Sequence, residues 1–168
     1  MNRPHAWRVV GLASAVFVLD RLSKGMVAHG MFVGQSIPLI PHLLELTYIL
    51  NSGAANGVLP HRDLLFIAVA FVLLFGLVWV AFTRGSLDRR LIWGMGLLAG
   101  GAAGNLWDRL VAGQVTDFIH FRYFPLVFNF ADASIVIGMG LVLWDFWRRP
   151  GVEAGHEPES RANDSLPS

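Results

Sequence analysis

The sequence predicts a mainly α-helical membrane protein with four transmembrane helices and a small extracytoplasmic β-sheet. Hydrophobic residues make up 54% of the chain and charged residues only 15%, well below the roughly 25% charged residues of soluble domains. Four apolar segments approach the length of about 20 residues that a helix needs to cross a hydrocarbon core. These segments cover residues 7–28, 64–82, 91–112 and 129–147. Together they predict a chain that folds within a membrane.

The first apolar segment could also be a secretory signal, because Arg3 and Arg8 precede the apolar run from Val9 to Leu19. A cleaved signal would end in a pair of small residues at the cleavage site. Here the run meets Asp20-Arg21-Leu22-Ser23-Lys24 instead. We therefore interpret it as a retained transmembrane helix.

Basic residues predict the orientation of the helices, because cytoplasmic loops carry an excess of lysine and arginine. If four helices alternate in direction, one side of the membrane holds Arg3, Arg8, Arg84, Arg89, Arg90, Arg148 and Arg149. The other side holds Arg21, Lys24, Arg62, Arg109 and Arg122, most of which have acidic neighbours. We predict that both termini are cytoplasmic.

The extracytoplasmic segment, residues 30–62, contains a β-rich run from Leu43 to Leu50 that ends in the turn signal Asn51-Ser52-Gly53. The segment Val115–Phe121 is also β-rich. We expect these runs to form a small sheet on the outer membrane surface, and residues 29–62 to act as a mobile cover.

The last residues, 150–168, are rich in Pro, Gly, Glu and Ser, which predicts a disordered cytoplasmic tail. A chain of 168 residues is short enough for a single domain. We expect that domain to be a four-helix membrane domain over residues 1–149, including the segment 30–62.

Most polar residues of the predicted helices lie at one depth. Asp132 precedes Trp147 by 15 residues, or roughly 22 Å of helix at about 1.5 Å per residue. This places Asp132 near the outer edge of a hydrocarbon core about 30 Å thick. The same arithmetic brings further polar residues to this level: Asp20, Lys24, Asn105, Asp108, Arg109 and Asn129. Asp117 follows a few residues after the third helix.

Asp117 and Asp132 are the candidate catalytic residues. Ionisable groups at the edge of a bilayer are costly and are usually retained for a task, and neither has an obvious basic partner. Two aspartates within hydrogen-bond distance share a proton, because both cannot ionise comfortably. The ionised one can accept a proton from water while the other polarises a scissile carbonyl. A structural role for either residue alone stays open.

The other polar residues also have structural interpretations. Asp20 and Lys24 are spaced i, i+4 with the acid first, the favourable order for a helical ion pair. Asp108 beside Arg109 suggests a second paired structural charge, and Asn105 either joins helices or orients substrate. A repeat of glycines at four-residue spacing predicts close helix packing: Gly96, Gly100 and Gly104.

Other catalytic classes find little support. The absence of cysteine excludes disulfides, thiolate metal sites and a cysteine nucleophile. The six histidines do not pair at helical metal-binding spacing, and no Gly-x-Ser-x-Gly turn marks a serine nucleophile. We therefore expect no metal and no cofactor. A net charge of +1 gives no electrostatic case for a nucleic-acid partner.

A small ion- or proton-coupled membrane transporter is the alternative function, because intramembrane Asp and Asn residues also line ion paths. Such a path needs polar groups through the full depth of the bilayer. The segment 64–82 has none, and the inner halves of the other helices are nearly apolar. The one-sided polar layer favours an enzyme whose site opens to the outer leaflet.

Five ordered motifs resemble those of the bacterial lipoprotein signal peptidase (signal peptidase II) family, and the resemblance covers nearly the whole chain. The motifs are Asp20-x-x-Ser23-Lys24, Asn51-Ser52-Gly53-Ala54-Ala55, Gly104-Asn105-x-x-Asp108-Arg109, Val115-x-Asp117-Phe118 and Phe128-Asn129-x-Ala131-Asp132-x-Ser134. The chain departs from the family pattern at Asn56, where phenylalanine is usual, so Asn56 is left out of the expected site.

The resemblance implies an intramembrane aspartyl endopeptidase that removes the signal peptide from diacylglyceryl-modified prolipoproteins, cutting before the lipidated cysteine. It implies that Asp117 and Asp132 are the catalytic pair. The residues expected to bind substrate or support the site are Asn51, Gly53, Asn105, Asp108, Arg109, Asn129, Asp20 and Lys24. We expect a monomer in the bacterial cytoplasmic (inner) membrane, with lipid-modified prolipoproteins and membrane lipids as its partners.

Overall fold

The computed structural model describes residues 4–53 and 62–148. Over these residues the chain forms α1 (Pro4–Gly30), β1 (Ser36–Ile40), β2 (Leu44–Asn51), α2 (Arg62–Thr83), α3 (Arg89–Ala112), β3 (Val115–Phe121), β4 (Val127–Phe128) and α4 (Phe130–Arg148). The expected tail at 150–168 and Asn56 lie outside the described residues.

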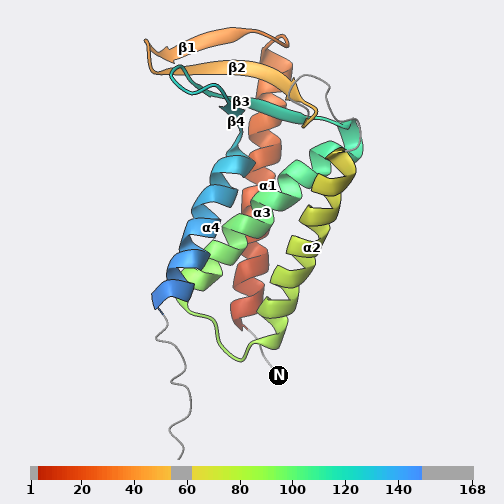
Figure 1. Cartoon of the computed structure of the whole chain (residues 1–168), viewed down its shortest axis with the longest axis vertical. Coiled ribbons are helices and arrows are strands. Elements are labelled where there is room, and N and C mark those ends of the chain that lie inside the picture. Colours follow the sequence, from red (N-terminus) through yellow and green to blue (C-terminus); the bar gives the residue numbers. More distant parts are fainter. Residues whose placement is uncertain (1–3, 54–61, 149–168) are drawn as a thin grey trace, which may run out of the picture.

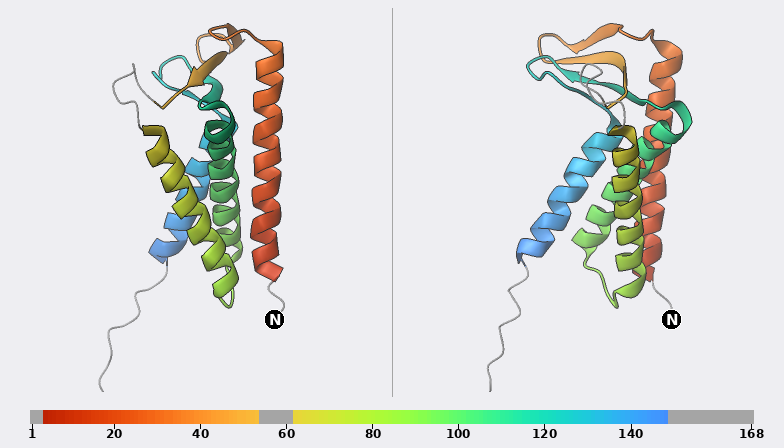
Figure 2. Two further views of the ribbon diagram at one scale, coloured as in Figure 1. Left: turned by 90° about the vertical axis from the view of Figure 1, so that its right-hand side faces the viewer. Right: turned by 45° about the vertical axis from the view of Figure 1, so that its right-hand side comes forward.

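The helices run side by side beneath the sheet, which covers one end of the bundle (Figure 1). Helix α1 begins and α4 ends at the opposite end, and the side views show the same arrangement (Figure 2). The prediction of a mainly helical protein with a small antiparallel sheet is therefore confirmed.

The sheet has the strand order β1-β2-β3-β4, and each neighbouring pair is antiparallel. The two β-rich runs of the sequence are β2 and β3. In their register Ile49 lies opposite Asp117, and Asn51 lies opposite Val115. This pairing brings the turn after β2 next to the aspartate of β3. The described part of the segment expected to be a cover forms β1 and β2, and its mobility stays a prediction.

Helix α3 lies at the centre of the bundle and packs closely against two neighbours through glycines. A Cβ on Gly96 would lie 2.6 Å from Leu12 of α1, and a Cβ on Gly100 would lie 2.6 Å from the carbonyl oxygen of Ala13. On the α4 side, a Cβ on Gly138 would lie 2.7 Å from the backbone of α3. The prediction of glycine-mediated helix packing is confirmed.

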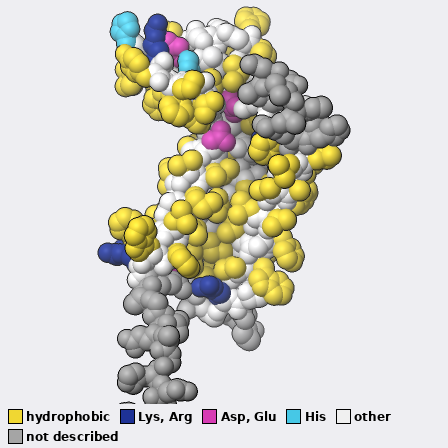
Figure 3. All heavy atoms as spheres, viewed as in Figure 1, with side chains coloured by type: hydrophobic (Ala, Val, Ile, Leu, Met, Phe, Trp, Pro, Cys, Tyr) yellow, Lys and Arg dark blue, Asp and Glu magenta, His cyan; other side chains and the backbone are white. Residues whose placement is uncertain are grey.

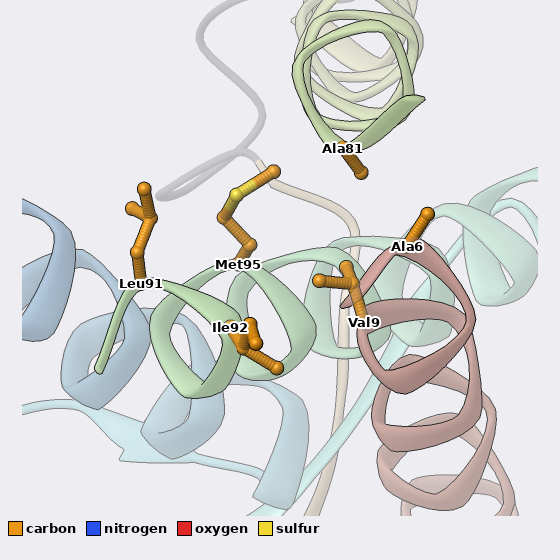
Figure 4. Close-up of a cluster of buried hydrophobic side chains, with 6 residues drawn as sticks. All are labelled: Ala6, Val9, Ala81, Leu91, Ile92 and Met95. Carbon is orange, nitrogen blue, oxygen red and sulfur yellow. The ribbon is translucent and has the colours of Figure 1, made fainter. Parts of the chain in front are cut away.

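At the end away from the sheet, α1, α2 and α3 meet in a group of buried side chains that we call the apolar cluster (Figure 4). Its members are small or aliphatic, apart from one methionine, and none carries a polar side chain. They are Ala6, Val9, Ala81, Leu91, Ile92 and Met95.

Apolar side chains also cover much of the outside of the helices (Figure 3). Among the described helices, two are long and apolar enough to cross a membrane, Leu64–Thr83 and Phe130–Arg148. Only 6% of the α2 window is buried within the protein, so most of its apolar side chains need another apolar environment. The structure supports a membrane protein, whereas the count of four spans stays a prediction.

Candidate active site

Asp117 is a buried carboxyl group on β3 that is held by two amide side chains. Its Oδ2 accepts a hydrogen bond of 2.9 Å from Asn51 Nδ2, and its Oδ1 accepts one of 2.6 Å from Asn129 Nδ2. The residue is only 1% exposed. Burial raises the pKa of Asp117 to about 6, although these two hydrogen bonds act against the shift.

Asp132 lies in the first turn of α4, where it forms a reciprocal cap with Asn129. Asn129 Oδ1 accepts a hydrogen bond of 2.9 Å from the Asp132 backbone N–H, and Asp132 Oδ2 accepts one of 3.1 Å from the Asn129 N–H. This is the geometry of a capping box. Both the N–H donor and the positive end of the helix dipole favour a carboxylate at this position.

Two asparagine side chains connect the aspartates. Asn105 Nδ2 donates to Asp132 Oδ1 over 2.7 Å, and Asn129 Nδ2, which holds Asp117, also donates to Asn105 Oδ1 over 3.2 Å. Within residues 4–53 and 62–148, the two carboxyl groups accept hydrogen bonds from the side chains of Asn51, Asn105 and Asn129 and from the Asn129 backbone N–H, and they form none with each other. The two groups thus belong to one network but have different surroundings.

Gly53 fixes the orientation of the Asn51 amide. Its N–H donates a 2.8 Å hydrogen bond to Asn51 Oδ1, which leaves Asn51 Nδ2 facing Asp117. The backbone of Gly53 has a φ of 74°, a conformation that glycine adopts without the strain caused by a Cβ. The expected supporting residues Asn51 and Gly53 therefore act as one unit at the end of β2.

Lys24 is the centre of a buried group of charges beside the asparagines. Its ammonium lies 2.9 Å from Asp20 Oδ2, 2.8 Å from Asp108 Oδ2 and 3.0 Å from Asn105 Oδ1. The predicted Asp20–Lys24 ion pair is confirmed. We call Asp20, Lys24 and Asp108 the charge cluster.

Asp20 connects the charge cluster to α4. Its Oδ1 accepts a 3.0 Å hydrogen bond from the backbone N–H of Ala131, in the same helical turn as Asp132. A Cβ on residue 104 would overlap the Asp20 carboxylate. The last glycine of the four-residue repeat, Gly104, therefore provides the space in which this carboxylate lies.

The expected pairing of Asp108 with Arg109 is wrong. Asp108 pairs with Lys24 and with Arg21 of α1, because adjacent residues on a helix point in different directions. Arg109 instead donates a 3.2 Å hydrogen bond to the carbonyl oxygen of Asn105, and its guanidinium carbon lies 4.9 Å from the ring centre of Phe66 on α2.

The structure brings all the expected site residues into one connected set, which we call the polar network. Asp117, Asp132, Asn51, Gly53, Asn105, Asn129, Lys24, Asp20, Asp108 and Arg109 are joined by the hydrogen bonds and ion pairs above. Arg21 and Phe66 also contact the set, and no sequence motif had indicated either of them. In the part of the chain that the structure describes, no group of three or more His, Cys, Asp or Glu side chains could hold a metal ion.

Comparison with known proteins gives one consistent result. Residues 12–148 match the family model described as signal peptidase (SPase) II. The lipoprotein signal peptidase of Desulfitobacterium hafniense is 41% identical over 137 residues, which are 82% of this chain and 89% of the relative. The corresponding protein of Pelotomaculum thermopropionicum is 44% identical over 133 residues, which are 79% and 87% of the two chains.

A solved structure has a similar fold. It is described as a bacterial membrane enzyme, determined by the in meso method at 1.9 Å resolution, and it matches with a TM-score of 0.78 and 31% sequence identity. The match covers 84% of this chain and 94% of the solved one. The family match over residues 12–148 includes every residue of the polar network, and this chain belongs to the signal peptidase II family.

Proposed function

We propose that this protein is an aspartyl endopeptidase that removes signal peptides from lipid-modified prolipoproteins, with Asp117 and Asp132 as its catalytic pair. The family and its named relatives support the activity. The observation that carries the residue assignment is the pair of carboxyl groups in one network but in different electrostatic surroundings. Such a difference separates an acid from a base.

Asp132 is the ionised member of the pair and the general base. The capping box gives its carboxylate an N–H donor and places it at the N-terminus of α4, and both favour negative charge. Asp117 is the member that takes up a proton more readily, because burial raises its pKa to about 6. Bound substrate would remove more water and favour the protonated form further.

These roles give a balanced reaction. Asp132 accepts a proton from water as the water oxygen attacks the scissile carbonyl carbon, and Asp117 gives its proton to the carbonyl oxygen. The resulting gem-diol then collapses. The C–N bond breaks, Asp132 returns its proton to the leaving amine, and a gem-diol hydroxyl returns one to Asp117. Both carboxyl groups end in their starting states.

Arg109 and Asn51 would position the substrate backbone. Within the described residues, Arg109 Nε is buried and has no hydrogen-bond partner, so a substrate carbonyl that reached it on binding would satisfy this donor. Asn51 is exposed on one side and bonded to Asp117 on the other. Both residues are hydrogen-bonded to members of the polar network, Asn51 to Asp117 and Arg109 to Asn105.

We propose a multi-pass arrangement in the bacterial inner membrane with cytoplasmic termini. Helices α1 and α3 have 27 and 24 residues, or roughly 40 and 36 Å, enough for a core about 30 Å thick. The outer ends of α1 and α3 carry charged residues of the polar network, which explains why these helices are less hydrophobic than α2 and α4. The sheet would lie on the outer membrane surface. Lipid-modified substrate would enter the site laterally from the membrane. The enzyme would be a monomer with a single domain, surrounded by membrane lipids.

The proposal is tested with purified protein in detergent and a diacylglyceryl-modified peptide that contains the signal sequence and its cysteine. We expect one cut, immediately before the lipidated cysteine, resistant to EDTA. The matched control is the same peptide without lipid. Cleavage at another bond, or activity that only zinc restores after EDTA, would contradict the proposal.

A further inference from the structure

Arg21 contacts the charge cluster although it occupies only an unspecified (x) position of the first motif. It precedes Lys24 on α1, and its Nη1 donates to Asp108 Oδ1. The Arg21 side chain is 32% exposed, while that of Asp108 is only 6% exposed. Arg21 therefore reaches from the surface of α1 to a buried carboxylate on α3.

The charge cluster is not neutral without Arg21. Asp20 and Asp108 are both acidic, and Lys24 is their common cation. Asp20, Lys24 and Asp108 are at most 4% exposed, and an uncompensated charge in such a place is costly. The guanidinium of Arg21 supplies the second positive charge that balances the cluster.

Asp108 connects this charge balance to the catalytic pair. Its Oδ1 faces Arg21, whereas its Oδ2 faces Lys24 and the backbone N–H of Thr116, at 3.4 Å. Thr116 directly precedes Asp117 on β3. The position of the Asp108 carboxylate thus bears on the position of Asp117.

The neighbouring elements offer no described replacement for Arg21. Arg109 of α3 is turned towards Asn105 and Phe66, and residues 64–83 of α2 contain no titratable side chain. The ionisable groups that β3 and α4 bring to this region are the acids Asp117 and Asp132. Removing Arg21 would therefore leave an excess negative charge close to both catalytic carboxyl groups.

We infer that Arg21 is a positioning residue for catalysis, which balances the charge cluster and, through Asp108, holds the strand that carries Asp117. This inference rests on the proposed peptidase function. The charge cluster acts electrostatically on Asp117. Burial is the main cause of the raised pKa of Asp117, and the positive charge of Lys24 lowers this pKa. An extra negative charge acts in the opposite sense to Lys24 and strengthens proton binding at Asp117.

The test compares Arg21→Gln, Arg21→Lys, Asp108→Asn and the double variant Arg21→Gln/Asp108→Asn in the lipopeptide assay across pH. For Arg21→Gln we expect kcat to fall about tenfold through misplacement of the pair, with little change in KM. The alkaline limb of kcat/KM should move to higher pH. Arg21→Lys keeps the charge and should keep the limb near its wild-type position.

The double variant separates charge balance from simple structural damage. Asp108→Asn alone should move the limb to lower pH, and the double variant should bring it back towards wild type, because its cluster is neutral again. Arg122→Gln is the matched control, since Arg122 pairs with Glu45 on the sheet, away from the cluster. It should leave the limb unchanged.

Four results would overturn the inference: an unchanged limb in Arg21→Gln, a limb in Arg21→Lys displaced as far as in Arg21→Gln, an effect confined to KM, or a double variant whose limb is further displaced. The proposed function fails separately, if Asp117→Asn or Asp132→Asn retains wild-type turnover. The melting temperature of each variant shows whether a low kcat reflects unfolded protein.

Discussion

The two ends of the helix bundle are held together in different ways. The polar network joins α1, α3, α4 and the sheet through directed hydrogen bonds and ion pairs between 2.6 and 3.4 Å long, apart from the close Arg21–Asp108 contact. The apolar cluster joins α1, α2 and α3 at the other end through packing of side chains without polar atoms.

This difference matches two tasks. Packing is non-directional and tolerates changes of shape that conserve volume, so the apolar cluster mainly supplies stability. Hydrogen bonds specify both distance and angle, so the polar network can fix Asp117 and Asp132 relative to each other although they lie on different elements. The comparison implies that substitutions in the polar network change the rate of catalysis, whereas substitutions in the apolar cluster change only stability.

The largest effect should come from the proposed catalytic pair. We expect Asp117→Asn and Asp132→Asn each to lower kcat by about a hundred- to ten-thousandfold, the usual contribution of acid–base catalysis. Each change also places an amide donor opposite an existing donor, at a cost of about 1–3 kcal/mol. Turnover of the lipopeptide is measured on protein shown by circular dichroism to be folded. Near-wild-type turnover in either folded variant rules out the pair.

Lys24→Met should lower both the stability and the activity of the protein. Removing the ammonium leaves two buried carboxylates without their common cation, and breaking a buried pair costs about 3–5 kcal/mol. Thermal unfolding in detergent measures this change. The charge-swapped variant Asp20→Lys/Lys24→Asp should not restore the melting temperature, because Asp108 and Asn105 also need the ammonium at position 24. Full restoration would mean that Asp20 is the only partner that matters.

Met95→Ala is the corresponding change in the apolar cluster. Met95 is 2% exposed, and a buried Met→Ala substitution costs about 2–5 kcal/mol. We expect a lower melting temperature but a kcat close to wild type below the transition. If kcat instead falls while the protein remains folded, the two ends of the bundle are coupled and the division of tasks is wrong.

Asn51→Ala should have the smallest effect, on pH dependence. The free enzyme needs the proton of Asp117, so kcat/KM should fall as the pH rises through its pKa of about 6. The hydrogen bond from Asn51 lowers this pKa, so its loss moves the alkaline limb to higher pH. A limb that moves to lower pH, or activity that rises with pH through this range, would show that Asp117 is not the proton donor.

Asp117 and Asp132 could be singled out from the sequence because charge is unusual in an apolar chain. Helical rise placed Asp132 at the same depth as Asp20 and Asn105, and the structure joins these residues in one network. The strands β2 and β3 also had clear patterns. β1 contains Pro38 and is exposed throughout, and β4 has only two residues, so neither had a periodicity to read.

The contacts of single charges were less predictable. Asp108 was assigned to its neighbour Arg109, although its partners lie on α1, and one of them, Arg21, is 87 residues away in the chain. Such a pairing depends on which faces of two helices meet. Here that contact is set by glycines on α3, and one sequence alone does not give the rotation of each helix.

The reciprocal cap between Asn129 and Asp132 links the start of α4 to the geometry of the proposed catalytic pair. The two hydrogen bonds that start α4 are also the bonds that orient the Asp132 carboxylate. A molecule whose last helix has not yet formed its first turn therefore lacks the oriented carboxylate that we propose as the base. Under the proposed mechanism, the site therefore becomes active only after the first turn of α4 has formed.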